Sequence, residues 1–122
     1  MKLITAIVRP EKLDEVIDAV LGNNGRGLTV TNVRGFGRQF GERAAGVVDT
    51  DMTTDGLPRY RRAILLTKVR LDIVVLDEDA QAMVDAIAKH AHTAVIGDGK
   101  IWVSAVDSVL RIRTGEKDRD AV

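Results

Sequence analysis

Two short segments in the last third of the chain carry residue types that bind phosphate. Residues 97–100 read Gly-Asp-Gly-Lys, which places flexible backbone amides beside a lysine ammonium, as in an anion-binding nest. The spacing is not the G-x-x-x-x-G-K-[ST] of a Walker A loop. The second segment holds Arg111 and Arg113. In an extended chain these two guanidinium groups face the same side, and guanidinium groups bind phosphate oxygens through paired hydrogen bonds.

Each segment alone also has a structural interpretation. A Gly-Asp-Gly sequence can form a turn between two elements, and arginines on an edge strand protect it from aggregation. Taken together, the two segments predict a triphosphate site. Gly35 and Gly37 add a further pair of glycines after an expected strand. No helix is expected to begin there, so this pair is not a dinucleotide-binding fingerprint.

The composition excludes several classes of protein. The chain has 122 residues, of which 45% are hydrophobic and 30% charged, as in a single soluble domain. Its 18 basic and 18 acidic residues give a formal net charge of zero, whereas nucleic-acid-binding domains usually carry a basic excess. Without cysteine, the chain has neither disulfides nor a thiolate metal site. We see no apolar run long enough for a signal peptide or a membrane span, and we expect a cytoplasmic protein.

The hydrophobic pattern of the first half predicts a strand, a helix and a second strand. Residues 2–9 are rich in Ile, Val and Thr, as in a strand, and Pro10 suits the first turn of a helix. Apolar residues then recur at helical spacing and are expected to face the core: Leu13, Val16, Ile17, Val20 and Leu21. Glycines end this helix, and residues 28–36 are expected to form the second strand.

The second half repeats this order. Residues 69–75 alternate like a half-buried strand, and Asp77 or Asp79 is expected to cap a helix that runs to about residue 92. The inward positions of this helix are expected to be Ala80, Met83, Val84, Ile87 and Ala91. Residues 101–106 predict another strand, and residues 109–114 a last extended piece.

The order of elements predicts an α+β fold of the ferredoxin-like type, β-α-β-β-α-β, with two helices on one face of an antiparallel sheet. The other face would be bare, and its apolar residues indicate burial between subunits. Residues 37–67, rich in Gly, Arg and Asp, form a long connection between strands two and three. At the end of this connection, residues 63–66 are expected to rejoin the sheet. The connection is either a tolerated insertion or a mobile loop that binds a partner, and we favour the loop.

Five stretches resemble the PII family of signal-transduction proteins: residues 1–13, 27–31, 35–39, 96–101 and 111–116. The resemblance treats residues 1–122 as one domain and covers nearly all of them, apart from about 41–66. It implies a homotrimer that binds ATP or ADP in clefts between subunits. It also implies that ATP with Mg²⁺ recruits the effector 2-oxoglutarate, and that a T-loop, at about 37–67, engages a target protein. The usual membrane target is an ammonium transporter; a paralogue could instead regulate a bicarbonate transporter or a metabolic enzyme.

The same resemblance implies roles for individual residues. The nucleotide would be bound by Gly35, Gly37, Arg38, Gln39, Gly97, Asp98, Gly99, Lys100, Arg111 and Arg113. The side-chain oxygen of Gln39 would reach the Mg²⁺ ion. Lys68, expected just before the third strand, would pair with a carboxylate of 2-oxoglutarate, with Arg9 and Gln39 nearby.

The sequence also departs from the family pattern. The T-loop is longer than usual, and Tyr60, the only tyrosine, lies away from the position that some members nucleotidylylate. We therefore do not carry that modification over. Phe40 replaces a usual lysine, His92 stands where an arginine is common, and residues 94–95 replace a usual Gly-Lys. Because these changes lower the positive charge near the phosphates, we expect a modest affinity for ATP.

Two other classes of protein fit less well. An enzyme that uses ATP needs a positioned base and acidic magnesium ligands, and Asp98 is the only acidic residue in the nest. An RNA-recognition domain reads bases with aromatic residues on its sheet, and this chain has one Tyr, one Trp and two Phe, without such a run. We therefore expect a regulator that is not an enzyme and does not bind nucleic acid.

Overall fold

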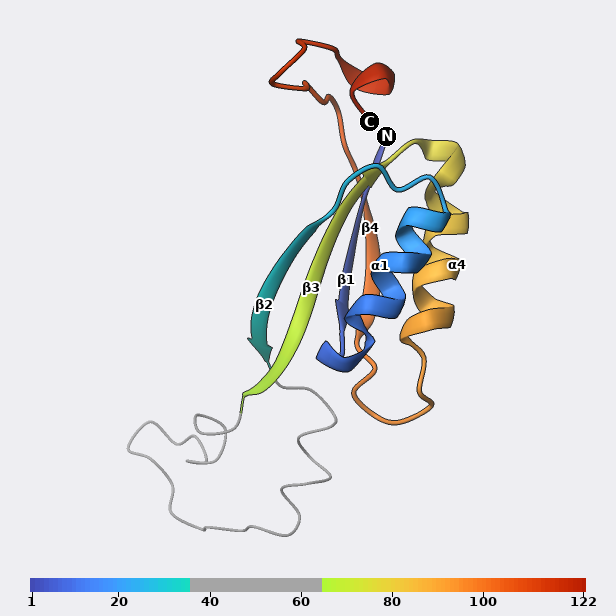
Figure 1. Cartoon of the computed structure of the whole chain (residues 1–122), viewed down its shortest axis with the longest axis vertical. Coiled ribbons are helices and arrows are strands. Elements are labelled where there is room, and N and C mark those ends of the chain that lie inside the picture. Colours follow the sequence, from blue (N-terminus) through green and yellow to red (C-terminus); the bar gives the residue numbers. More distant parts are fainter. Residues whose placement is uncertain (36–64) are drawn as a thin grey trace, which may run out of the picture.

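The computed structural model of the chain describes residues 1–35 and 65–122. Their elements follow the predicted order (Figure 1): β1 (Lys2–Val8), α1 (Leu13–Gly22), β2 (Thr29–Gly35), β3 (Leu66–Val75), α4 (Ala80–Ala91) and β4 (Lys100–Ala105). Short 3-10 turns lead into both helices, and a third, Asp118–Ala121, lies near the C-terminus. The predicted ferredoxin-like α+β fold is confirmed.

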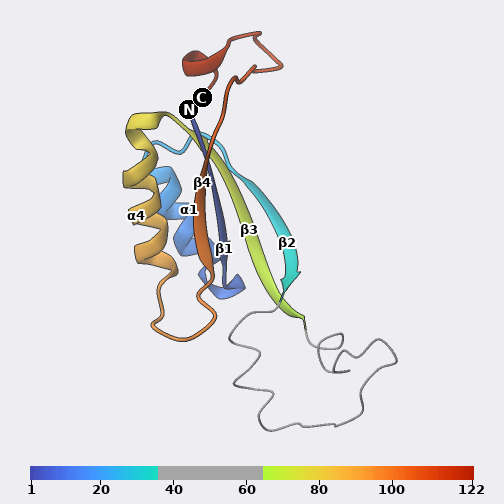
Figure 2. The same cartoon turned by 180° about the vertical axis from the view of Figure 1, so that it is seen from behind.

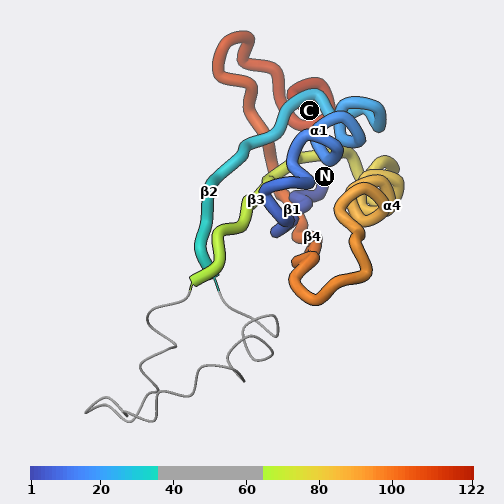
Figure 3. The backbone as a smooth tube through the Cα atoms, turned by 60° about the horizontal axis from the view of Figure 1, so that its bottom comes forward, coloured from blue at the N-terminus to red at the C-terminus, as the bar shows by residue number. Residues whose placement is uncertain are grey.

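The four strands form one antiparallel sheet in the order β2-β3-β1-β4. Both helices pack side by side on one face of it, as Figures 2 and 3 show. The two chain termini lie at one end of the sheet, and the loop between α4 and β4 lies at the other end (Figure 1).

The core lies between the sheet and the two helices. Successive side chains of a strand point to opposite faces, so alternate residues of the central strands are buried. These residues, together with the helix residues that meet them, are Ile4, Ala6, Val8, Val69, Leu71, Ile73, Val75, Val16, Val20, Met83 and Ile87. The predicted inward positions of α4 all belong to the core or pack against it.

The first helix differs from the prediction in where it starts and in the direction of one side chain. Pro10 starts a 3-10 turn, and the α-helix begins only at Leu13. Leu21 is 60% exposed, so the prediction that it faces the core is wrong. The buried face includes Ala19 and Val20, and Leu21 follows Val20 by about 100° around the helix, beyond the edge of that face.

The second helix begins without the predicted side-chain cap. Asp79 occupies the N-cap position, but its side chain makes no capping hydrogen bond. The carboxylate of Asp77 lies 2.9 Å from the N-terminal ammonium of Met1 instead. The 3-10 turn before the helix has its own i→i+3 hydrogen bond, from the Asp79 amide to the Leu76 carbonyl, which continues the chain into the helix without a cap.

Two strand boundaries also differ from the prediction. β3 begins at Leu66, where it pairs with Gly35, so Lys68 lies within the strand and not before it. The connection between β2 and β3 therefore rejoins the sheet at Leu66. β4 begins at Lys100, one residue before the predicted start, because Lys100 pairs with Ile7 of β1. In both cases pairing with a neighbouring strand extends the strand beyond its alternating sequence.

The predicted extended piece at residues 109–114 is wrong, because the chain turns back on itself there. Leu110 forms an isolated bridge with Lys117. Between them the Gly115 amide donates to the Arg111 carbonyl (2.8 Å), and the Arg111 amide donates to the Glu116 carbonyl (2.9 Å). Gly115 has a φ of +73°, a conformation that glycine adopts without strain. The alternation of Arg and Ile suggested a strand, but the glycine allows a tight turn.

The sheet face opposite the helices is mixed in character. Its apolar residues are Leu3, Ile7, Val33, Leu66, Val74 and Trp102. Among them lies a polar network in which the buried Thr5 hydroxyl donates to Asp72 (2.6 Å). Arg70 donates to both carboxylate oxygens of Asp72, at 2.8 and 3.0 Å. Burial of this face between subunits stays a prediction.

Candidate anion-binding site

The loop between α4 and β4 is folded around the carboxylate of Asp98. Asp98 accepts hydrogen bonds from the amides of Thr93 (2.7 Å) and Ala94 (3.1 Å) and from the Thr93 hydroxyl. The Thr93 hydroxyl, and then the Thr93 amide and Arg9, lower the pKa of Asp98 despite the opposing effect of burial. Asp98 was predicted to bind the nucleotide. In the structure its carboxylate organises the loop, and binding of the nucleotide by Asp98 stays a prediction.

Arg9 fastens this loop to the end of β1. Its Nε donates to Asp98 at 2.9 Å, and its Nη2 donates to the carbonyls of Val95 (3.2 Å) and Ile96 (2.8 Å). The Arg9 side chain is only 12% exposed. Arg9 was predicted to lie near a 2-oxoglutarate carboxylate. In the structure the Arg9 guanidinium donates most of its hydrogen bonds to the loop at residues 95–98. A direct contact with 2-oxoglutarate stays a prediction.

Two glycines give the loop its path. Gly97 has a φ of +108° and Gly99 a φ of +95°, a region that favours glycine. At Gly99 a Cβ atom would lie 1.7 Å from the carbonyl oxygen of Ile7, so the loop backbone lies directly against β1. The sequence predicted a flexible turn, and in the structure the turn backbone lies in close contact with β1.

Lys68 reaches the same loop from β3. Its Nζ donates to the carbonyl of Gly97 at 2.5 Å. Burial, and after it the positive charge of Arg9, lower the pKa of Lys68, while Glu11 and Asp98 act in the opposite direction. Lys68 is therefore a partly buried cation at the edge of the predicted nest.

The register of the sheet explains why these residues meet. Lys100 of β4 pairs with Ile7 of β1, and β3 pairs with the other side of β1. Side chains two residues apart on a strand share a face. Two residues further toward the loop lie Arg9, just after β1, Lys68, within β3, and Asp98, just before β4. Residues far apart in the sequence therefore converge at one end of the sheet.

The chemistry of this end suits an anion with several oxygens. Lys100 is exposed at the start of β4, directly after Gly99. Arg70 lies in the same cross-strand row as Lys100, although it is paired with Asp72. A defined glycine loop beside lysine ammonium groups can bind phosphate or carboxylate oxygens.

The carboxylates of Asp98 and Asp72 predict how stability depends on pH. Arg70 lowers the pKa of Asp72, as the loop lowers that of Asp98. Because both folded-state pKa values lie below the unfolded value of about 3.9, both groups stabilise the fold above that pH. This stabilisation is lost as the pH falls through the folded-state values, because the unfolded chain binds more protons. Urea unfolding should show a falling free energy of unfolding below about pH 4, with a shallower fall in Asp98→Asn and in Asp72→Asn. An unchanged slope in both variants would contradict these assignments.

The second predicted segment forms the turn at residues 111–116. Arg111 binds the Glu116 carboxylate, which also accepts a hydrogen bond from the Thr114 hydroxyl at 2.7 Å. Arg113 lies within the turn and is exposed. It makes no ion pair or hydrogen bond with the residues of ranges 1–35 and 65–122. The two guanidinium groups are therefore not alike, and they do not share one side of a strand as predicted.

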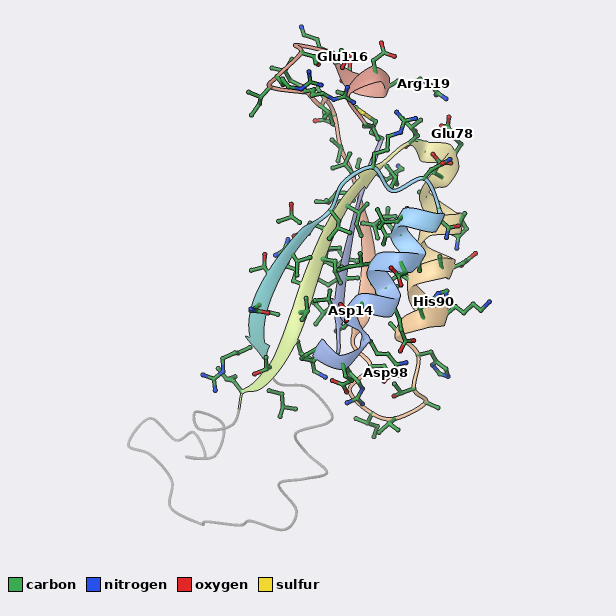
Figure 4. The ribbon with its side chains drawn as sticks, in the orientation of Figure 1. Asp14, Glu78, His90, Asp98, Glu116 and Arg119 are labelled. Atoms are coloured by element: carbon green, nitrogen blue, oxygen red, sulfur yellow. The ribbon has the colours of Figure 1, made fainter. Side chains whose placement is uncertain are left out.

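The two predicted phosphate-binding segments lie at opposite ends of the folded molecule. Figure 4 shows Asp98 at one end of the sheet and Glu116 at the other. One chain alone therefore does not bring them together. A site that uses both segments needs a second copy of the chain, with one end of each copy against the opposite end of its neighbour.

A cavity of about 410 Å³ beside Arg111 is lined by residues that were not predicted from the sequence. Thr29, Asp72 and Val74 line it together with Arg111 and Arg26. Thr29 and Asp72 are cross-strand partners, so only the pairing of β2 with β3 could have revealed them. Apolar surface, a hydroxyl and a carboxylate next to a guanidinium suit a flat ring with polar edges that carries a phosphate.

Several predicted site residues cannot be placed at this site. Gly35 is described, at the end of β2 opposite Leu66. Gly37, Arg38 and Gln39 lie outside the described residues, as do Tyr60 and most of the predicted T-loop. None of the helices in the described ranges is long and apolar enough to cross a membrane.

Comparison with known proteins gives a consistent result along the whole chain. The sequence model of the family described as "Nitrogen regulatory protein P-II" matches residues 1–116. The chain is 48% identical to nitrogen regulatory protein P-II 2 of Methanothermobacter thermautotrophicus, over the whole chain and 97% of that relative. It is 44% identical to nitrogen regulatory protein P-II of Rhizobium meliloti and 45% identical to that of Synechocystis, over the full length of both chains in each case.

Proposed function

The chain belongs to the nitrogen regulatory protein P-II family, and from this we propose that it is a signal-transduction regulator that binds ATP or ADP and does not act as an enzyme. The observation that carries the proposal is the loop at residues 97–100. Asp98 and Arg9 hold this loop in one path, Gly97 and Gly99 permit that path, and Lys100 follows directly. This loop would form a cradle for phosphate oxygens.

The nucleotide would bind between two copies of the chain. The phosphates would lie against residues 97–100 of one copy, while Arg111 and Arg113 would come from the neighbouring copy. The location of these segments at opposite ends of the folded molecule supports this arrangement. The cavity beside Arg111, lined by Thr29 and Asp72, would receive the nucleoside. The family resemblance favours a homotrimer.

The effector 2-oxoglutarate would bind next to the phosphates. The ammonium of Lys68 would pair with one of its carboxylates, and Lys68 already lies at the Gly97 carbonyl. Gln39 would supply an oxygen to a Mg²⁺ ion that also contacts the nucleotide, since Mg²⁺ prefers oxygen ligands. Binding of 2-oxoglutarate is then expected to require ATP and Mg²⁺.

The position of the T-loop supports a link between ligand and target. The loop leaves the sheet after Gly35 and returns at Leu66, two residues before Lys68. A ligand at Lys68 would therefore contact the base of the loop. It would shift the loop only as far as its affinities for the two loop states differ. We propose that the target is a membrane transporter, such as an ammonium transporter, or a metabolic enzyme.

Calorimetry with the purified chain tests this function. ATP and ADP should each bind, and 2-oxoglutarate should bind only when ATP and Mg²⁺ are present. Lys68→Met should weaken 2-oxoglutarate binding by about tenfold or more, because one charged hydrogen bond is lost. Lys89→Met, at an exposed position on α4, is the matched control and should leave binding unchanged.

The outcomes separate the parts of the proposal. Absence of binding for both ATP and ADP would refute the nucleotide-sensing function. Normal 2-oxoglutarate binding in Lys68→Met would refute only the assigned role of Lys68. A product that accumulates over many turnovers with ATP would favour an enzyme.

A further inference from the structure

We propose that Glu116 competes with phosphate for the guanidinium of Arg111, so that an incoming phosphate must displace this carboxylate. The proposal rests on the proposed function, because it concerns an arginine of the same site. It adds a contact that opposes binding and is built into the C-terminal turn.

The turn holds the two side chains together. The backbone bonds between Arg111 and Glu116 and between Gly115 and Arg111 close it, so that the Arg111 and Glu116 side chains leave neighbouring points of the backbone. The Thr114 hydroxyl donates to the same carboxylate oxygen that Arg111 binds. Glu116 is thus oriented toward Arg111 by two groups and is not merely a nearby surface charge.

The carboxylate occupies the place that a phosphate oxygen would take. A guanidinium binds carboxylate and phosphate through the same N–H donors. The side chains of Arg111 and Glu116 are 34% and 45% exposed, so a ligand can reach the pair. Exposed ion pairs are individually weak, and a polyphosphate of higher charge can replace the carboxylate.

Arg113 provides an internal contrast on the same turn. It is exposed and has no ion-pair partner among the residues that the structure describes. A phosphate can therefore pair with Arg113 without breaking any described contact, whereas pairing with Arg111 exchanges one anion for another. Every phosphate that binds Arg111 must displace Glu116 and loses the same binding free energy. Anions that bind weakly, such as inorganic phosphate, are therefore left with little or no affinity.

The test compares Glu116→Gln with the wild type by calorimetry, with ATP and with inorganic triphosphate as probes. Removing the competing charge should tighten binding of both probes by about two- to fivefold, the range expected for loss of an exposed ion pair. The affinity of the variant should also fall more steeply with added NaCl, because binding then forms a charge pair without breaking one. A merely structural role of Glu116 would not produce this change in salt dependence.

Glu78→Gln is the matched control. Glu78 forms an ion pair with Arg119, and Figure 4 shows both residues at the same end of the molecule as Glu116. Glu78 also lines the cavity of about 600 Å³ that Arg111 and Glu116 line. This variant makes the same change in net charge but leaves the Arg111 pair intact. Its effect on affinity should be clearly smaller than that of Glu116→Gln.

The results distinguish this proposal from the function on which it rests. If the wild type binds ATP and Glu116→Gln binds it equally or more weakly, the competition is refuted and the nucleotide site stands. The competition is also refuted if Glu78→Gln tightens binding as much as Glu116→Gln. If neither the wild type nor Glu116→Gln binds ATP or triphosphate, both proposals fail.

Discussion

Replacing both Arg111 and Arg113 by Ala is expected to weaken ATP binding by roughly 3–6 kcal/mol, the largest effect that we predict. Each charge-assisted hydrogen bond is worth about 1.5–3 kcal/mol, and at least two would be lost. Of the single variants, Arg113→Ala should cost more, because Arg111 must first leave Glu116. Calorimetry measures the affinities, and circular dichroism should show an unchanged fold because both side chains lie on a surface turn.

The control for this pair is Arg119→Ala. Arg119 is an exposed arginine of the same C-terminal segment and is paired with Glu78. Its loss should change the affinity by well under 1 kcal/mol, as is usual for exposed ion pairs. Wild-type affinity in the double variant Arg111→Ala/Arg113→Ala would show that the pocket lies elsewhere.

The second large effect is expected at Gly99. A Cβ atom in Gly99→Ala would lie 1.7 Å from the Ile7 carbonyl oxygen, and a φ of +95° is strained for alanine. The loop must then move away from β1, or the fold must bear the clash. We expect the free energy of unfolding to fall by about 3–5 kcal/mol, as for other severe backbone conflicts. Urea unfolding at a fixed protein concentration measures this loss.

Gly22→Ala is the matched control for this glycine. A Cβ atom at Gly22, the last residue of α1, meets nothing within 4 Å. Alanine is the better helix former, so stability should be unchanged or higher by up to about 1 kcal/mol. A similar, small change in Gly99→Ala would mean that the loop does not lie against β1 as described.

The sequence was sufficient to predict the fold because its periodicity follows the burial. Val69, Leu71 and Ile73 alternate with polar residues, and all three are buried on the face that meets the helices. The helix pattern failed only at the margin of a buried face, at Leu21. There an apolar residue type does not determine which way the side chain points.

The path of the C-terminal segment could not be predicted in the same way. Arg111 to Arg113 alternates like a strand, but no strand of the described ranges 1–35 and 65–122 pairs with it, and the conformation of Gly115 turns the chain back. Local alternation indicates a strand only where a partner strand is available. The ion pair between Arg111 and Glu116 is a consequence of that turn and was equally hidden.

Several residues of the predicted site lie together in the structure, but their contacts were not predicted. Gly97, Gly99 and Lys68 were singled out from the sequence, and the structure brings them into contact or close to it. The hold of Asp98 on its loop was not predicted, because one of its partners, Arg9, is brought to it by the register of the sheet. Register depends on pairing between distant strands, which one sequence does not reveal.

The separation of the glycine nest from the arginine turn has a consequence for stoichiometry. If a ligand needs both segments, a single copy of the chain cannot bind it. A contact between unlike ends of two copies is head-to-tail, and every copy can make both contacts only when the copies close into a ring. The number of ligands then equals the number of copies, and dilution that opens the ring removes the ability to sense them. Two defective chains, one without the arginines and one without the nest, should restore working sites when they are mixed.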